Sequence, residues 1–220
     1  MHVQRAVQLK DGPKAILCTD LSKERVEVLE KTNTKECNER SIRFQTLTRD
    51  QADYDQQLTA FAGEGFDDII VCAPSADAIA EALPHLASGG VINIFAGVAK
   101  NTFVEFDYSP SFLKGVRVIG FSGSTVEDMQ ITLDLIEAGE FAPNRLVAAI
   151  GSIEAAKDGL KAVQTSRFPG KIVIYNHIKE LELTPIPELK TRLPSVYAKL
   201  KDGVEWTQAA ETELLRLMLK

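Results

Sequence analysis

The chain of 220 residues is 45% hydrophobic and 25% charged, a composition typical of a folded protein with a sizeable core. Its formal net charge of −6, with no obviously basic segment, argues against nucleic acid as a partner. No apolar run approaches the roughly 18 residues of a membrane span, and no signal-peptide core lies at the start, so we expect a cytoplasmic protein with no membrane partner.

Helices and short apolar strands alternate along the first part of the chain. We expect helices over His2–Leu9, Ser22–Lys31, Tyr54–Ala62, Ala76–Leu86 and Val126–Ala138, and strands over Lys14–Thr19, Ser41–Thr48, Asp68–Ala73, Val91–Ala96 and Arg117–Phe121. The continuous apolar run of Asp68–Ala73 predicts a strand buried on both faces. Strands separated by helices indicate βαβ units, and therefore an α/β fold with a mostly parallel sheet.

The remaining chain continues this pattern and then changes. Two further strands, Leu146–Ile150 and Lys171–Tyr175, flank a helix expected over Ile153–Val163. Leu181–Pro194 holds three prolines, which predicts an extended surface segment. Two closing helices are expected over Val196–Leu200 and Thr207–Leu219. The second has an apolar stripe of Leu214, Leu215 and Met218 that should pack onto the body of the protein.

Asp20 ends the first apolar strand. An acidic residue at this place in a Rossmann fold binds the diol of an adenosine ribose. The alternative is that Asp20 caps the helix that begins near Ser22, since aspartate is a favoured N-cap residue. Arg25 lies one helical turn further on, and we expect it to be a surface charge.

Four segments together resemble the nucleotide-binding half of the medium-chain, zinc-type alcohol and polyol dehydrogenases. Met1–Leu9 is similar to the helix that follows the family's Gly-rich loop, Ile16–Arg25 to its second strand with the ribose-binding acid, Gly65–Ala73 with Gly89–Gly97 to its fourth and fifth strands, and Phe168–Tyr175 to its closing strand. The tail segments Leu183–Leu189 and Val204–Thr207 resemble the branch that contains the sorbose-1-phosphate reductases.

The resemblance implies a Rossmann-like, doubly wound, mostly parallel sheet that lacks its first strand and Gly-rich loop and carries a C-terminal helical tail. It implies a truncated dinucleotide-binding domain over residues 1–144, a segment over 145–176 that would return to an absent catalytic domain, and an extension with two helices over 177–220. We expect Met1 to be an internal methionine of a longer protein. Without the central strand, a gap should open in the sheet.

The resemblance also implies a set of cofactor-binding residues. Asp20 and Leu21 would lie at the ribose, Ala73–Pro74 and Ala96–Val98 would flank the ribose and the nicotinamide carboxamide, Gly120–Ser122 would follow the sixth strand, and Lys171 would point at the pyrophosphate. The set is Asp20, Leu21, Ala73, Pro74, Ala96, Gly97, Val98, Gly120, Phe121, Ser122 and Lys171. The charge of Asp20 favours NAD over NADP, because a 2′-phosphate would meet a like charge. The alternatives are ordinary loops, with Gly97 present only for its φ, and an ordinary Gly-Lys strand start at Lys171.

We expect no catalytic or metal-binding residue in this chain. His2, His85 and His177 are isolated, and the three cysteines lack the spacing of a zinc site. The catalytic zinc of the family would therefore belong to a full-length parent protein. Glu105–Leu113 with Val116–Phe121 resembles the family's dimer edge, which predicts a homodimer; a plain edge strand is the alternative.

Three functions are compatible with the sequence. The first is the cofactor-binding portion of an NAD(P)-dependent alcohol, polyol or sugar-phosphate dehydrogenase, inactive as this chain alone. The second is a non-catalytic module that binds a nucleotide or dimerises. The third is a methyltransferase-like domain that uses S-adenosylmethionine, because Phe66–Pro74 followed by Leu86–Gly90 resembles its fourth strand and helix. That class normally ends in an antiparallel hairpin, and Ser122–Tyr175 fits a dehydrogenase better.

Overall fold

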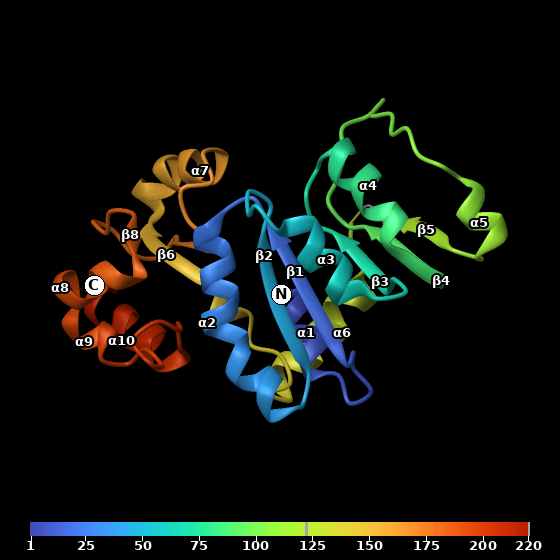
Figure 1. The fold of residues 1–220 in the computed structure, drawn as a ribbon. Coiled ribbons are helices and arrows are strands. Elements are labelled where there is room, and N and C mark those ends of the chain that lie inside the picture. The colour runs from blue at the N-terminus through green and yellow to red at the C-terminus, as the bar shows by residue number, and fades with distance from the viewer. Residues whose placement is uncertain (122, 220) are drawn as a thin grey trace. The chain divides into compact units, whose positions relative to one another are not determined.

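The structure, a computed structural model, describes residues 1–121 and 123–219. It is a mixed α/β protein whose sheets consist mostly of parallel strands and whose C-terminal end is helical (Figure 1). By their contacts the residues form two compact units: Met1–Thr48 together with Gln130–Lys220, and Arg49–Met129. The domain boundaries expected after residues 144 and 176 stay predictions.

The N-terminal part of the first unit is a βαβ motif preceded by a short helix. Its elements are α1 (His2–Gln8), β1 (Ala15–Asp20), α2 (Lys23–Glu39) and β2 (Arg43–Thr48). β1 and β2 pair in parallel over their full lengths, so β2 is an edge strand, as its alternating sequence predicts. A small apolar core packs Val7, Cys37 and Ile42 against Val3, Ile16 and Phe44.

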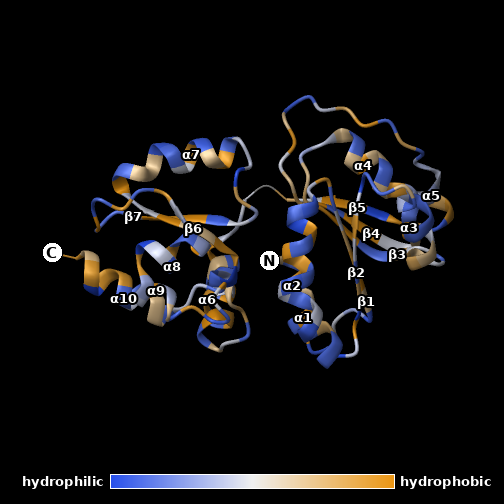
Figure 2. Ribbon diagram, turned by 60° about the vertical axis from the view of Figure 1, so that its left-hand side comes forward, coloured by the Kyte–Doolittle hydropathy of each residue, from blue (hydrophilic) through white to orange (hydrophobic). Residues whose placement is uncertain are grey.

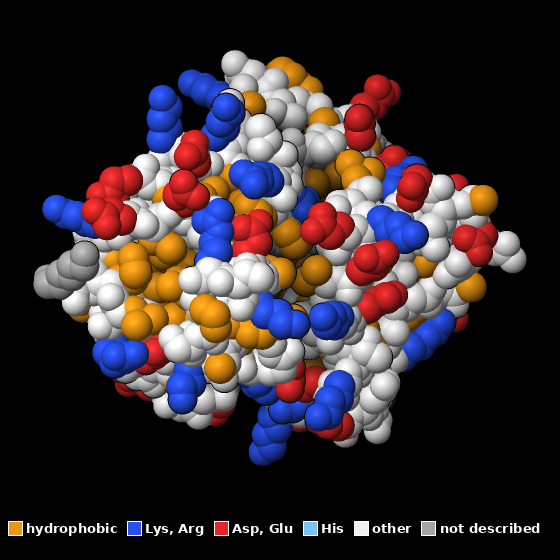
Figure 3. Space-filling model, turned by 90° about the vertical axis from the view of Figure 1, so that its left-hand side faces the viewer, with side chains coloured by type: hydrophobic (Ala, Val, Ile, Leu, Met, Phe, Trp, Pro, Cys, Tyr) orange, Lys and Arg blue, Asp and Glu red, His pale blue; other side chains and the backbone are white. Residues whose placement is uncertain are grey.

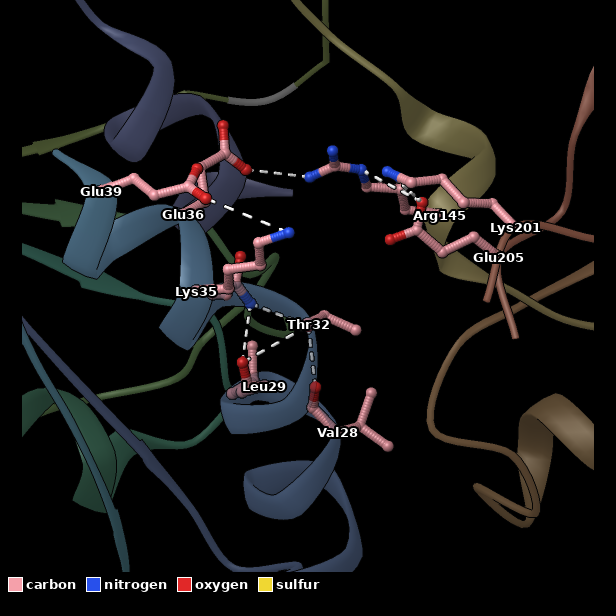
Figure 4. Close-up of polar contacts among 10 residues, drawn as sticks. Val28, Leu29, Thr32, Lys35, Glu36, Glu39, Arg145, Lys201 and Glu205 are labelled. Atoms are coloured by element: carbon pink, nitrogen blue, oxygen red, sulfur yellow. Dashed lines mark hydrogen bonds and ion pairs between the residues drawn. The ribbon is translucent and has the colours of Figure 1, made fainter. Parts of the chain in front are cut away.

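Helix α2 is longer than the sequence predicts, since it runs past Lys31 to Glu39. The side chains of Thr32, Asn33 and Thr34 each donate a hydrogen bond to the backbone carbonyl four residues earlier, at 2.7, 2.8 and 2.7 Å. These residues usually weaken a helix because their side chains compete for backbone groups. Here the competing groups are satisfied within the helix, which therefore continues (Figure 4).

The C-terminal part of the first unit has its own three-stranded sheet and core. Its elements are α6 (Val126–Glu137, which starts in the second unit), β6 (Val147–Ser152), α7 (Ala156–Gln164), β7 (Lys171–Tyr175), β8 (Thr184–Pro185), α8 (Leu189–Arg192), α9 (Pro194–Tyr197) and α10 (Gln208–Met218). The strand order is β7-β6-β8, with β6 and β7 parallel and β8 antiparallel to β6. The core holds the fully buried Ile150, Ile178, Leu189 and Leu214. As predicted, Leu215 and Met218 of α10 pack against it.

The prediction for Leu181–Pro194 is wrong. Instead of an extended surface segment, this stretch forms β8, a 3-10 turn at Ile186–Glu188 and helix α8. Leu189 is fully buried, and Ile186 is nearly so. Pro187 lies in the first turn of its short helix, where the missing N–H of proline has no helical partner to lose, so the prolines do not prevent helical turns.

The second unit is a parallel three-stranded sheet with helices. Its elements are α3 (Tyr54–Ala62), β3 (Phe66–Val71), α4 (Ala76–Ala82), β4 (Leu86–Ile94), α5 (Ser109–Leu113) and β5 (Arg117–Gly120). The order β3-β4-β5 places β5 at an edge, and α4 packs on one face (Figure 1). The core on that face contains Val71, Ile79, Leu83 and the fully buried Ile92. The short helix α5 was not expected from the sequence.

The prediction that Asp68–Ala73 is buried on both faces is also wrong. Ile70 is 39% exposed, and so is Ile119, which lies in the same row of the sheet two strands away. Ile69 and Val71 point to the opposite face and pack with the core around α4. A continuous apolar run therefore marks the strand correctly, but the burial of each face depends on which elements cover it.

The predicted fold class is confirmed, because parallel strands, crossover helices and a helical C-terminal end are all present. Among the described residues, β1-β2 and β3-β4-β5 form separate sheets, one in each unit. Hydrophobic and hydrophilic residues alternate along helices α2 and α7 (Figure 2). No helix in the described part of the chain is long and apolar enough to cross a membrane. On the face seen in Figure 3, Lys and Arg side chains are interspersed with Asp and Glu side chains.

Candidate cofactor-binding edge

Asp20 is the last residue of β1, at the carboxyl end of a parallel pair of strands. Its Oδ1 accepts a hydrogen bond of 2.8 Å from the backbone N–H of Ser22. The N-cap of α2 is Ser22, whose hydroxyl accepts from the N–H of Arg25 at 3.4 Å. The alternative role of Asp20 as the helix N-cap is therefore wrong. One carboxylate oxygen of Asp20 instead stabilises the turn between β1 and α2, and the Asp20 side chain is 27% exposed.

Arg25 lies in the first turn of α2 and reaches back to the same carboxylate. Its Nη1 is 3.7 Å from Asp20 Oδ2, and its side chain is 40% exposed. Arg25 is a surface charge, as expected, and it also pairs with the strand end, because the helix start at Ser22 turns its side chain toward Asp20. The end of β1 thus presents one acidic and one basic group side by side. Leu21, between Asp20 and the N-cap Ser22, is 84% exposed.

In the second unit the carboxyl ends of three parallel strands lie in register. Val71 of β3 is opposite Ile94 of β4, which is opposite Gly120 of β5. The backbone N–H groups of Phe95 and Ala96 both donate to the Val71 carbonyl, at 3.1 and 3.0 Å, which holds the loop after β4 against the end of β3. Parallel strands bring the loops that follow them to one edge, where ligands of open α/β sheets bind.

The structure brings together the expected loop residues of this unit. Ala73 and Pro74 are exposed after β3, and Ser75 then caps α4 by accepting from the N–H of Ala78 at 3.4 Å. Gly97 and Val98 are exposed after β4. The list of loop residues at this edge is Ala73, Pro74, Ala96, Gly97, Val98, Gly120 and Phe121. Ser122 lies outside the described residues.

Gly97 is not explained by backbone strain or by packing. Its φ is outside the left-handed region, and a Cβ built on it would have no atom within 4 Å. The alternative that Gly97 is present only for its φ is therefore wrong. The space beside its Cα is open, which is the arrangement in which a glycine lets a ligand approach the backbone closely.

Lys171 belongs to the first unit, at the amino end of β7, where it is exposed and pairs with Val147 of β6. A Cβ at the preceding Gly170 would collide with the carbonyl oxygen of Leu146. Close approach of two strands therefore accounts for this glycine without a ligand.

Sequence reasoning missed the pairing of Arg25 with Asp20. The signal that could have found it is the helix start: with Ser22 as N-cap, Arg25 falls in the first helical turn, directly over the strand end. Among the described residues, no three His, Cys, Asp or Glu side chains are grouped so that they could hold a metal ion.

The zinc-binding dehydrogenase family matches residues 5–138 of the chain. The uncharacterized protein YggP of Escherichia coli (strain K12) is 32% identical over 178 residues, which are 76% of this chain and 41% of that protein. The L-sorbose 1-phosphate reductase of Klebsiella pneumoniae is 30% identical over 169 residues, which are 75% of this chain and 40% of that enzyme. The chain thus spans about two fifths of the length of these curated relatives.

Among solved structures, the 2R,3R-butanediol dehydrogenase from Bacillus subtilis is similar over 79% of this chain and 47% of that one. The TM-score is 0.62 and the sequence identity 18%, so this likeness concerns the fold alone. The resemblance predicted from the sequence is confirmed by these matches.

Proposed function

The chain belongs to the zinc-binding dehydrogenase family, and from that premise we propose that it is the dinucleotide-binding portion of an NAD(P)-dependent dehydrogenase. The observation that carries the proposal is the common edge formed by the loops after β3, β4 and β5, with open space beside Gly97. In this role the exposed backbone of Ala73–Pro74 and Ala96–Val98 binds the ribose and the nicotinamide carboxamide. Gly120 and Phe121 belong to the same edge. From the family resemblance, we also propose that Lys171 of the first unit contributes charge for the pyrophosphate.

The dinucleotide supplies the hydride chemistry of the reaction, and this chain's residues bind and orient it. The described residues do not fit the catalytic zinc of the family, because they contain no group of three metal-binding side chains. We therefore expect the 220-residue chain alone to oxidise no polyol and reduce no sugar phosphate. Zinc-dependent turnover by the purified chain would contradict that expectation.

The end of β1 is proposed to choose between the two nicotinamide cofactors. The second carboxylate oxygen of Asp20, Oδ2, can accept from the ribose diol of NAD, and the negative charge of the carboxylate repels a 2′-phosphate. Arg25, only 3.7 Å from Asp20, supplies a positive charge that offsets part of this repulsion. We thus propose that the chain prefers NAD over NADP and that Arg25 makes this preference smaller.

The substrate class proposed for the intact enzyme is an alcohol, a polyol or a sugar phosphate. The 30% identity to an L-sorbose 1-phosphate reductase favours the sugar phosphate. The methyltransferase alternative lacks support, because β6 and β7 pair in parallel rather than as the antiparallel hairpin of that class.

A homodimer through residues 105–121 is part of the proposal. β5 is an edge strand with all four residues exposed, and the neighbouring Phe112 and Leu113 are 90% and 73% exposed. A groove of about 280 Å³ beside them is lined by Phe106, Tyr108 and Val118, among others. Exposed apolar edge strands favour strand addition by a second copy. Ile119→Lys on β5 should therefore halve the mass in sedimentation velocity. Ile70→Lys, equally exposed but on β3 at the opposite edge of the same sheet and outside residues 105–121, should not.

The cofactor proposal is tested by titrating NADH and NADPH separately into the purified chain by calorimetry. Asp20→Asn keeps an oxygen for the Ser22 N–H but removes the charge, and should weaken NADH binding about tenfold, because a hydrogen bond to a charged group contributes about 1.5–3 kcal/mol. Arg25→Met should weaken NADPH binding more than NADH binding. Glu24→Gln, exposed in the same helical turn, is the matched control and should change neither.

Equal NADH affinity for the wild type and Asp20→Asn would refute the ribose assignment. A chain that dimerises but binds neither nucleotide would favour the non-catalytic dimerisation module instead.

A further inference from the structure

The first unit contains two apolar cores that share no residue. One core belongs to the N-terminal βαβ motif and includes Val7, Cys37 and Ile42. The other lies between Val147 and Leu214 and is built by the C-terminal sheet and helices. In the described part of this unit, neither cluster contains a side chain from the other region. The joint between the two regions therefore needs interactions other than a common apolar core.

A group of four charged side chains spans that joint (Figure 4). Arg145 donates from Nη1 to Glu36 Oε2, in the last turns of α2, at 3.0 Å. Its Nε lies 3.6 Å from Glu205 Oε2, and Lys201 Nζ lies 3.5 Å from the same oxygen. We call these four residues the Arg145 clasp. Two positive and two negative charges alternate through it, so each carboxylate is compensated.

Burial distinguishes three side chains of the clasp from the exposed ion pairs of the described residues, whereas the fourth, Lys201, is 56% exposed. The side chains of Glu36, Arg145 and Glu205 are only 23%, 22% and 16% exposed. By contrast, the neighbouring pair of Lys35 and Glu39, on the same end of α2, is 91% and 63% exposed, with 4.0 Å between its charged atoms. Partly buried charges are screened less by solvent and are costly to leave unpaired, whereas exposed pairs contribute little.

A second polar contact holds the same place. Asn144, the residue before Arg145, donates from Nδ2 to the backbone carbonyl of Trp206 at 2.6 Å. Both residues belong to the 3-10 turn Pro143–Leu146 that leads into β6. One short turn thus binds the Glu205–Trp206 segment through a side-chain ion pair and a backbone hydrogen bond, and binds α2 through Glu36.

We infer that the Arg145 clasp is a salt-sensitive network of ion pairs that holds the C-terminal region against α2. Its ion pairs can break while both apolar cores stay folded. Removal of the guanidinium leaves Glu36 and Glu205 as two partly buried carboxylates without their shared partner, so the joint loosens. This conformational device is independent of any bound nucleotide, and its test uses none.

Hydrogen exchange of the full chain, followed by mass spectrometry, tests the inference. Arg145→Met should speed amide exchange about tenfold in peptides covering residues 34–40 and 199–206, which a loss of about 1.4 kcal/mol of local protection would produce. Peptides from α10 should exchange as in the wild type, because that helix packs in the C-terminal core. Lys35→Met is the matched control at the same end of α2 and should leave all peptides unchanged.

A rescue variant separates the clasp from a general loss of stability. In Arg145→Met/Glu36→Gln/Glu205→Gln both carboxylate charges that lose Arg145 are gone, so protection at the joint should recover most of the lost factor. Raising NaCl from about 0.05 M to about 1 M should speed exchange at the joint of the wild type but not of this triple variant. Wild-type exchange in Arg145→Met, an equal loss in Lys35→Met, or a loss that extends through α10 would each overturn the inference.

Discussion

Leu214 of α10 tests whether the C-terminal helix is a structural part of the protein. Its side chain is fully buried in the C-terminal core, together with Leu189 and Val196. Leu214→Ala removes buried carbon atoms and leaves a cavity, at a cost of 2–5 kcal/mol at comparable sites. Since Leu214 is 0% exposed, we expect about 3 kcal/mol. With a urea dependence of about 1–3 kcal/mol per M, the unfolding midpoint should fall by about 1–3 M.

The assay has a built-in reporter. Trp206 is the only tryptophan of the chain, is 4% exposed and lies in the same core. Urea unfolding followed by its fluorescence therefore reports on the region that Leu214 stabilises.

The matched control is Leu217→Ala, on the same helix but 38% exposed, for which we expect a loss below about 1 kcal/mol. Both substitutions change helix propensity equally, so the difference between them measures packing. Equal midpoints for the two variants would refute the packing of α10 on this core.

Three further predictions concern single side chains. Gln4 is 5% exposed and its amide atoms have no hydrogen-bond partner among the described residues, so Gln4→Met should stabilise the protein by about 1 kcal/mol in thermal unfolding; a loss would mean that the amide is paired in solution. Hydrogen bonds from Arg216 lower the pKa of Glu213 to about 2, so the contribution of Glu213 to folding stability is present above pH 4.5 and is lost as the pH falls toward 2. The difference in folding stability between wild type and Glu213→Gln should therefore shrink over that window, and a constant difference would contradict this prediction. Burial and the 2.9 Å hydrogen bond to Glu211 raise the pKa of Tyr175 above 10. The folding stability of the wild type should therefore fall as the pH rises beyond 10, and that of Tyr175→Phe should fall less. Spectroscopic titration of the phenol should show the raised pKa directly.

The sequence predicts the strands well because their signal is local. The apolar run of Lys14–Thr19 became β1 with a shift of one residue, and Lys171–Tyr175 became β7 without change. A run of β-branched and apolar residues between turn signals needs no knowledge of its neighbours. Helix ends are less local, as α2 shows: its extension to Glu39 depends on hydrogen bonds that polar side chains make back to the helix itself.

Burial is predicted less well because it depends on distant elements. In the apolar run Ile69–Val71 of β3, Ile69 and Val71 face the core around α4, whereas Ile70 on the other face stays 39% exposed. Leu189 is the opposite case, since a proline-rich segment that looks like surface supplies a fully buried side chain. Both errors have one cause: sequence pattern gives the chemistry of a face, and the element that covers it lies elsewhere in the chain.

The cofactor edge shows how structure adds to residue type. Sequence names the loops after three strands as candidates, but only the register that aligns Val71, Ile94 and Gly120 brings those loops to one edge. Sequence also leaves two reasons for Gly97, a special φ or room for a ligand. The φ of Gly97 lies outside the left-handed region, which removes the first reason, and a Cβ built on it would have no atom within 4 Å. At the other glycine of the edge, Gly120, a Cβ would lie 3.3 Å from the Ile94 carbonyl oxygen. Gly97 therefore supports the proposed dinucleotide role more directly than Gly120 does.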